Sequence, residues 1–221
     1  MQFSVIDQNT DPSRAEAAMF KDGLLVPLPA SELAKIPQPE LSLACNRHGV
    51  YQIPSTELIE YLRGEMGDPS KAMEVGAGNG CIGRALGIRM TDNWLQTRPD
   101  IKAYYEMIGQ VTVKYGEDVE KIEALEAFEK YKPEVVIGCW ITERVKGGVT
   151  IGHVEGVREM EMFERGLKKY IHVGNNKTHG PKLKRMLDND LGITCKAFTI
   201  DWLFSRSMSK SENSIYIFEK P

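Results

Sequence analysis

Short apolar runs alternate with helical apolar stripes along this 221-residue chain. Runs of strand length end at Val75, Asp92 and Trp140, and the last of these is apolar at consecutive positions. Consecutive apolar positions are typical of a strand that is buried on both faces of a parallel sheet. Leu58, Ile59 and Leu62 lie between such runs and repeat with helical spacing. Strands separated by helices predict an α/β fold with a doubly wound, mostly parallel sheet.

The same patterns predict individual elements. Strands are expected at residues 72–75, 88–92, 111–115, 134–140, 170–174, 194–201 and 214–218. Helices are expected at residues 13–21, 56–65, 82–86, 102–109, 120–131, 159–169 and from 183 onward. The polar stretch 175–182 is expected to be a loop. We interpret residues 1–45, which are interrupted by prolines, as an N-terminal extension, and residues 46–221 as a Rossmann-like cofactor-binding domain.

Composition narrows the class of protein. The chain is 42% hydrophobic and 27% charged, which is typical of a globular protein with a full core. Its net charge of −3 argues against a surface dominated by nucleic-acid binding. The four cysteines have no paired spacing, which favours reduced thiols and a cytoplasmic location. We expect no signal peptide and no membrane span, because the N-terminus lacks a basic start and no apolar run is long enough.

Candidate chemistry is concentrated in the segment Glu74-Val-Gly-Ala-Gly-Asn-Gly80. It is expected to run from a strand into a tight turn and then into a helix, where backbone N–H groups are open to a ligand. Gly78, Gly80 and Gly83 also fit the Gly-x-Gly-x-x-Gly pattern of dinucleotide-binding folds. That pattern requires an acid about 20 residues further on; Asp92 comes too early for it, and the acid Glu74 before the glycines has no part in it.

An acid at a strand end followed by Gly-x-Gly-x-Gly resembles the first motif of class I S-adenosylmethionine-dependent methyltransferases. The resemblance implies a seven-stranded sheet with an antiparallel last strand, S-adenosylmethionine as cofactor, and methyl transfer by direct displacement. It implies that Glu74 helps to place the methionine amine, that Asp92 binds the ribose, and that Asp118 and Val119 contact the adenine. The cofactor residues that it implies are Glu74, Gly76, Ala77, Gly78, Gly80, Asp92, Asp118, Val119, Cys139 and Trp140.

Fewer sequence features indicate the methyl acceptor. Residues 139–143 read Cys-Trp-Ile-Thr-Glu and not Asn-Pro-Pro-Tyr, the signature of amino-methylating enzymes, so we expect a small-molecule acceptor in preference to nucleic acid. Tyr51 is a candidate lining residue, and His179 and Glu143 are candidate general bases by residue type and position. Basic residues outnumber acids between 177 and 210, either as a rim for an anionic acceptor or as a scattered surface excess.

Two other functions stay open at this point. One is a non-catalytic S-adenosylmethionine-binding module of the same fold, which the short interval from Gly76 to Asp92 favours. The other is a nicotinamide-dependent oxidoreductase. A metal site is not expected, because Cys45-x-x-His48 has metal-compatible spacing but no second pair of ligands nearby.

Overall fold

A computed structural model describes residues 7, 9–142, 145–146, 149–150, 157–188 and 191–220. Within this part of the chain a seven-stranded sheet runs in the order β11-β13-β10-β7-β4-β5-β6. Its strands are β4 (Ala72–Val75), β5 (Arg89–Asp92), β6 (Glu120–Lys121), β7 (Val135–Cys139), β10 (Lys169–Asn175), β11 (Thr194–Thr199) and β13 (Asn213–Glu219). The five strands from β10 to β6 are parallel, whereas β13 is antiparallel to both β10 and β11. The predicted mostly parallel sheet with an antiparallel last strand is confirmed.

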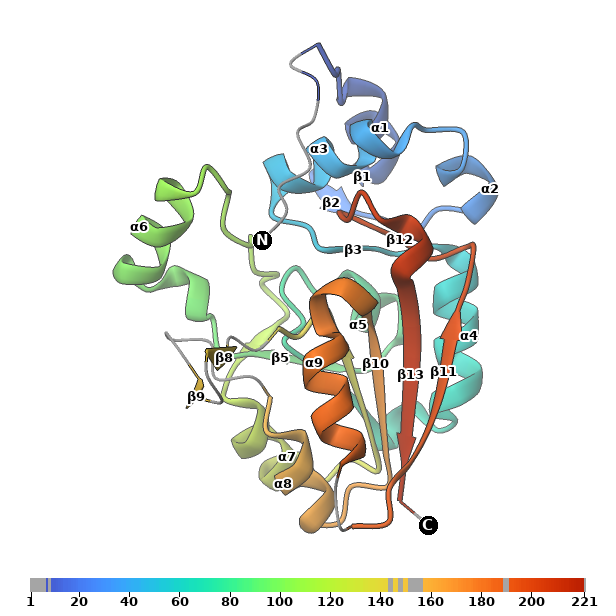
Figure 1. Cartoon of the computed structure of the whole chain (residues 1–221), viewed down its shortest axis with the longest axis vertical. Helices are drawn as coiled ribbons and strands as arrows, with labels where there is room; N and C mark the ends of the chain where they lie inside the picture. Colours follow the sequence, from blue (N-terminus) through green and yellow to red (C-terminus); the bar gives the residue numbers. More distant parts are fainter. Residues whose placement is uncertain are drawn as a thin grey trace.

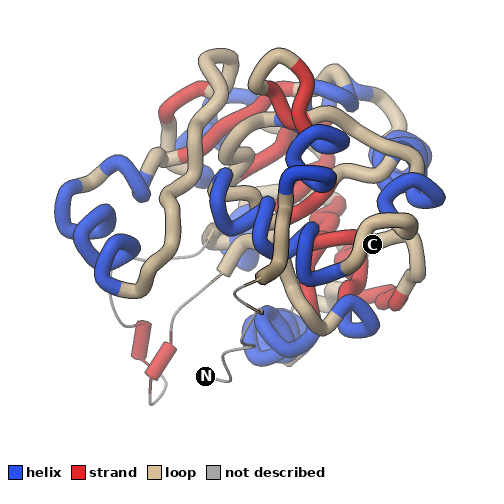
Figure 2. Tube along the Cα trace, turned by 90° about the horizontal axis from the view of Figure 1, so that it is seen from above, coloured by secondary structure: helices blue, strands red, loops and turns tan. Residues whose placement is uncertain are grey.

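Helices cover both faces of the sheet (Figures 1 and 2). One face carries α4 (Thr56–Met66) and α5 (Cys81–Leu86), and the other carries α7 (Ala124–Tyr131), α8 (Glu159–Glu164) and α9 (Asn176–Leu187). Alternate strand residues supply the two cores, because successive side chains of a strand point to opposite faces. In β7, for example, Ile137 packs with the α4 side and Val136 with the α7 side.

The N-terminal part forms a third apolar cluster at one end of the sheet (Figure 1). It contains α1 (Ser13–Met19), β1 (Phe20–Lys21), β2 (Leu24–Leu25), α2 (Ala30–Leu33), α3 (Gln38–His48) and β3 (Gln52–Ile53). Cys81 at the start of α5 belongs to this cluster, and so does Phe204 in β12 (Phe204–Ser205), which pairs with β3. The division at residue 45 stays a prediction; α3 crosses it.

The remaining elements are short. They are η1 (Pro69–Lys71), η2 (Leu95–Thr97), α6 (Pro99–Met107), β8 (Val145–Lys146), β9 (Val149–Thr150) and η3 (Lys210–Glu212). In Figure 1, α6 stands away from the sheet, at the left of the view. None of the described helices is both long and apolar enough to cross a membrane.

Several sequence predictions about elements are wrong; among them, helices predicted at 13–21 and 159–169 end at Met19 and Glu164. Residues 111–115 alternate like a strand but form no ladder, and the edge strand is β6, two polar residues that pair with β5. The predicted helix 120–131 therefore begins only at Ala124. The predicted loop 175–182 is instead the start of α9, because the Asn175 side chain accepts a hydrogen bond from the Lys177 N–H and so caps the helix.

Candidate active site

A cavity of about 580 Å³ lies at the carboxyl ends of β4, β5 and β7. Open α/β sheets hold ligands at this edge, beyond the carboxyl ends of the strands. The glycine turn after β4, the end of β5 and the end of β7 all contribute to the wall. The volume falls in the usual range for cofactor and small-ligand sites.

The alternate glycines of the turn are required by the backbone and by neighbouring side chains. Gly76, Gly78 and Gly80 have φ values of 60°, 55° and 74°, a region that residues with side chains rarely adopt. A Cβ on Gly76 would collide with the Ile141 side chain, and one on Gly78 would lie 3.2 Å from Val113 Cγ1. Gly76, Ala77 and Gly78 line the cavity. Gly80 is not among the lining residues; it caps the N-terminus of α5.

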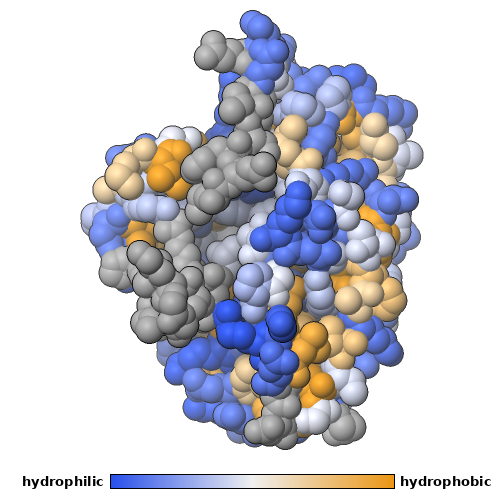
Figure 3. Space-filling view, viewed as in Figure 1, coloured by the Kyte–Doolittle hydropathy of each residue, from blue (hydrophilic) through white to orange (hydrophobic). Residues whose placement is uncertain are grey.

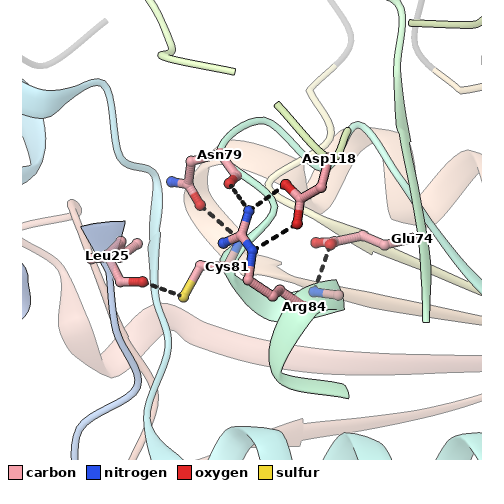
Figure 4. Close-up of polar contacts among 7 residues, drawn as sticks. Leu25, Glu74, Asn79, Cys81, Arg84 and Asp118 are labelled. Carbon is pink, nitrogen blue, oxygen red and sulfur yellow. Dashed lines mark hydrogen bonds and ion pairs between the residues drawn. The ribbon is translucent and has the colours of Figure 1, made fainter. Parts of the chain in front are cut away.

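The Glu74 side chain lies beneath this glycine turn, at the bottom of the cavity. This side chain is 2% exposed, lines the cavity, and accepts a hydrogen bond of 2.8 Å through Oε2 from the Gly83 N–H (Figure 4). Burial raises the pKa of this carboxyl to about 8, although the Gly83 hydrogen bond works in the opposite direction. A cationic ligand group in the cavity would favour the ionised form.

Asp92 stands at the end of β5, as predicted, and lines the cavity. Its Oδ2 accepts from the Gly78 N–H at 3.0 Å and its Oδ1 accepts from the Trp94 N–H at 2.8 Å. The carboxylate therefore ties the glycine turn to the end of β5. Each oxygen retains a lone pair that can accept a hydrogen bond from a ligand hydroxyl.

Asp118 and Val119 do not follow the third strand; they precede β6, and neither is among the lining residues. Asp118 forms a two-pronged ion pair with Arg84, with Nε to Oδ2 at 2.8 Å and a second nitrogen to Oδ1 at 2.5 Å (Figure 4). Val119 is packed in the interior at 3% exposure. The residues that line the cavity after β6 are Ile122, Glu123 and Ala124. Sequence reasoning missed them because it placed the third strand too early.

An aromatic wall faces the turn across the cavity. Tyr51 and Trp140 both line it, as predicted, with ring centroids 6.2 Å apart. The Trp140 indole N–H donates to Gln52 Oε1 at 2.9 Å, and the Tyr51 hydroxyl lies 3.0 Å from that of Tyr105. Trp140 has a φ of 57°, so its backbone is in the left-handed region directly after β7. Strained positions of this kind cluster at ligand sites.

Of the two predicted general bases, the structure describes one, His179. His179 is 1% exposed in α9 rather than in a loop, and it lies edge-on to Trp140 with centroids 5.2 Å apart. Burial lowers the pKa of His179 to about 4, with help from the charge of Lys182, so its imidazole is neutral at pH 7. His179 is not among the lining residues, and its role as a base stays a prediction. Glu143 lies outside the described residues.

Cys139 lines the cavity, and burial raises its pKa well above the usual range.

The described lining contains acidic but no basic side chains, and one of the acids, Asp100, is paired with Arg98 at 3.0 Å. The ionisable carboxyl groups of the lining are Glu74, Asp92, Asp100 and Glu123, and among the described residues no lysine, arginine or histidine contributes to it. Such a wall favours a ligand with a positive charge and disfavours phosphate. Gln96 is a further lining residue that sequence reasoning missed; its side-chain oxygen accepts from the Val113 N–H at 2.8 Å.

No protein-family model and no curated protein sequence matches the chain. Solved structures match it, including an rRNA methylase from Streptococcus thermophilus, with 14% identity, a TM-score of 0.41, and coverage of 74% of this chain and 95% of the other. The N-terminal domain of human METTL16 in complex with S-adenosylhomocysteine matches with 14% identity, a TM-score of 0.39, and coverage of 96% and 83%. A candidate RNA methyltransferase from Pyrococcus horikoshii matches with 15% identity, a TM-score of 0.34, and coverage of 83% and 96%.

These matches include methyltransferases by name, and the sheet described above has the seven-stranded, mostly parallel form that the resemblance to class I methyltransferases implies. They also contradict one expectation. A small-molecule acceptor was expected in preference to nucleic acid, whereas the activities named among the matches are mainly on RNA. The preference for a small molecule is therefore withdrawn.

Proposed function

We propose that this protein is an S-adenosylmethionine-dependent methyltransferase. The observation that carries the proposal is the cavity beside the glycine turn, with its four carboxyl groups and, among the described residues, no cationic side chain in its lining. S-adenosylmethionine carries a sulfonium and an ammonium against a single carboxylate, so its charge complements this wall.

The lining residues fit the parts of that cofactor. The backbone of Gly76 to Gly78 would hold the methionine end, with Glu74 close enough to the turn to receive the ammonium. Asp92 would accept hydrogen bonds from the ribose hydroxyls. The segment 122–124, at the end of β6, would contact the adenine.

When bound, the cofactor supplies a methyl group that its sulfonium already activates. This chain's contribution would be alignment of the acceptor against that methyl group by Tyr51 and Trp140, which line the same cavity. Holding two reactants in line removes much of the entropic barrier of a bimolecular step. A base is needed only for an acceptor that must lose a proton.

The same lining argues against a nicotinamide dinucleotide. Its pyrophosphate would enter a wall of carboxyl groups, and α5, the helix after the turn, is only six residues long. Thermal unfolding with S-adenosylmethionine, S-adenosylhomocysteine, NAD and NADP compares the candidates directly. Ligand at about 100 times its Kd stabilises the fold by about 2.7 kcal/mol. Protection by the two adenosyl compounds alone is expected, and protection by NAD or NADP alone would overturn the proposal.

A further inference from the structure

Three cations form a basic rim, which we define as Lys177, Arg206 and Lys210. Lys177 is exposed at the start of α9, and Arg206 and Lys210 are partly exposed around the loop after β12. Lys177 Nζ donates to Ser209 Oγ at 3.1 Å, which brings the helix and the loop together. In Figure 3 the surface over the N-terminal end of α9 is strongly hydrophilic. Within the described part of the chain, no ion pair neutralises any of the three.

The loop that carries Arg206 and Lys210 is held against the cavity wall. The Arg206 N–H donates to the Tyr51 carbonyl at 3.0 Å, and the Arg206 guanidinium lies 4.4 Å from the centroid of the Tyr51 ring. Ser42 Oγ donates to the Arg206 carbonyl at 2.6 Å. Gln38 Nε2 donates to the Ser207 carbonyl at 2.9 Å. Because Tyr51 also lines the cavity, the basic rim adjoins the mouth of the aromatic wall.

Charge is thus separated across a short distance. The described ionic side chains of the cavity lining are carboxyl groups, whereas the rim beside it consists of three cations, of which Lys210 interacts electrostatically with Asp201. A phosphate group would be repelled by the carboxyl groups of the cavity lining and attracted by the cations of the basic rim. A planar, uncharged ring would be accepted inside, where Tyr51, Tyr104, Tyr105, Tyr115 and Trp140 line the wall.

We propose that the site accepts a single-stranded polynucleotide, with one base in the aromatic half of the cavity and its phosphodiester backbone on Lys177, Arg206 and Lys210. A basic track beside aromatic side chains is the arrangement that binds single strands. This inference rests on the proposed function, which assigns the other half of the cavity to the cofactor.

The backbone part is tested by fluorescence anisotropy with labelled oligouridine and oligodeoxyuridine, which differ only in the sugar, across a salt series. The rim variant Lys177→Gln/Lys210→Gln is compared with Lys132→Gln/Lys184→Gln, which removes the same charge from two exposed positions; Lys184 is on the same helix, about 10 Å from Lys177 along the axis. Each lost phosphate contact reduces the slope of log K against log salt by about 0.7, so the rim variant should lose about 1.4.

Equal slopes for the rim variant and its control would overturn the proposal, as would wild-type protein that binds neither oligonucleotide at about millimolar concentration. Binding of both oligonucleotides supports the shared phosphodiester chemistry, and binding of one alone identifies the sugar.

The base part is tested with inorganic polyphosphate and the variant Tyr51→Ala. We expect this variant to bind oligouridine at least about fivefold more weakly, because stacking is lost, and to bind polyphosphate as the wild type does. Equal losses for both probes, or no loss for either, would overturn the insertion of a base. S-adenosylhomocysteine titrations of the same samples separate the two proposals. Oligonucleotide binding without S-adenosylhomocysteine binding would refute only the cofactor proposal. S-adenosylhomocysteine binding without oligonucleotide binding would refute only the polynucleotide proposal.

Discussion

The carboxyl group of Glu74 lies beneath the glycine turn at 2% exposure, with a pKa that burial raises to about 8. A folded-state pKa above the unfolded value means that the folded protein binds the proton more tightly. Glu74 therefore contributes stability that is complete below about pH 4.5 and is lost as the pH rises through about 8.

We expect Glu74→Gln to gain stability relative to the wild type as the pH rises across this window. The glutamine side-chain oxygen can still accept from the Gly83 N–H, and no charge is buried at high pH. Thermal unfolding of both proteins at about pH 5 and about pH 8.5 measures the difference. A difference in Tm that does not change with pH would show that Glu74 has no raised pKa.

Gly80 and Gly87 offer a matched comparison at the two ends of α5. Their φ values are 74° and 72°, so an added Cβ strains both backbones equally. At Gly80 the Cβ would also lie 2.8 Å from Val119 Cγ2 and 2.9 Å from Met90 Sδ, whereas at Gly87 nothing lies within 4 Å.

We expect Gly80→Ala to be less stable than Gly87→Ala by about 1–3 kcal/mol in urea unfolding, the usual cost of overpacking. Equal stabilities would mean that backbone strain alone explains the requirement for glycine at position 80.

Among the elements, the segment 110–119 acts as a strap across the glycine turn. Gly116 N–H donates to the Gly78 carbonyl at 3.2 Å, and Arg84 connects Asp118 to the Asn79 carbonyl at 3.1 Å (Figure 4). A Cβ on Gly116 would lie 2.7 Å from the Asn79 oxygen, so a side chain there would push the strap away.

Arg84 thus positions the turn without lining the cavity. We expect Asp118→Asn to weaken S-adenosylhomocysteine binding about five- to tenfold, equivalent to about 1–1.4 kcal/mol. Because the pair is partly exposed, its loss should lower the free energy of unfolding by at most about 1 kcal/mol. Calorimetry and urea unfolding measure the two quantities.

The control is Glu129→Gln, which breaks the similarly exposed pair with Arg165, a pair between α7 and the end of α8. Equal affinities of Asp118→Asn, the control and the wild type would refute a positioning role for the strap.

The strap also shows where sequence patterns succeed and where they do not. Buried strands and long amphipathic helices were predictable, because core burial imposes their periodicity; α4 begins at Thr56, as expected, and Ser55 is its cap. Val113 and Tyr115 alternate like strand residues, but they serve the cavity wall and bond with Gln96 instead of a ladder.

Residues of the candidate site were more predictable the nearer they lie to the end of a strand with a clear apolar pattern. Glu74 and Asp92 lie at the carboxyl ends of β4 and β5, and Trp140 directly follows β7; they could be placed at this edge from the sequence, since parallel strands end at one edge of the sheet. Glu123 was missed because the two-residue strand before it carries no apolar signal. The burial of His179 was missed because the polar stretch 175–182 was expected to be a loop; Pro181 is the sixth residue of α9 and lies inside the helix, where it lacks the N–H for a helical hydrogen bond.

At the scale of the whole molecule, the third apolar cluster joins the N-terminal part to the site. Cys81 at the start of α5 packs in that cluster, and its Sγ donates to the Leu25 carbonyl at 3.1 Å. Gln52, in β3, holds the Trp140 indole while its side-chain nitrogen donates to the Phe204 carbonyl at 2.7 Å. The turn and the aromatic wall therefore both depend on the N-terminal part.

Calorimetric titration of the protein with S-adenosylhomocysteine tests the central claim most directly. We expect saturable binding by the wild type, and at least about tenfold weaker binding by Asp92→Asn, because an asparagine has one acceptor oxygen for the two backbone N–H groups that Asp92 holds. Glu129→Gln should bind as the wild type does. Absence of binding by the wild type at about millimolar ligand, which corresponds to less than about 4 kcal/mol of binding free energy, would contradict the account.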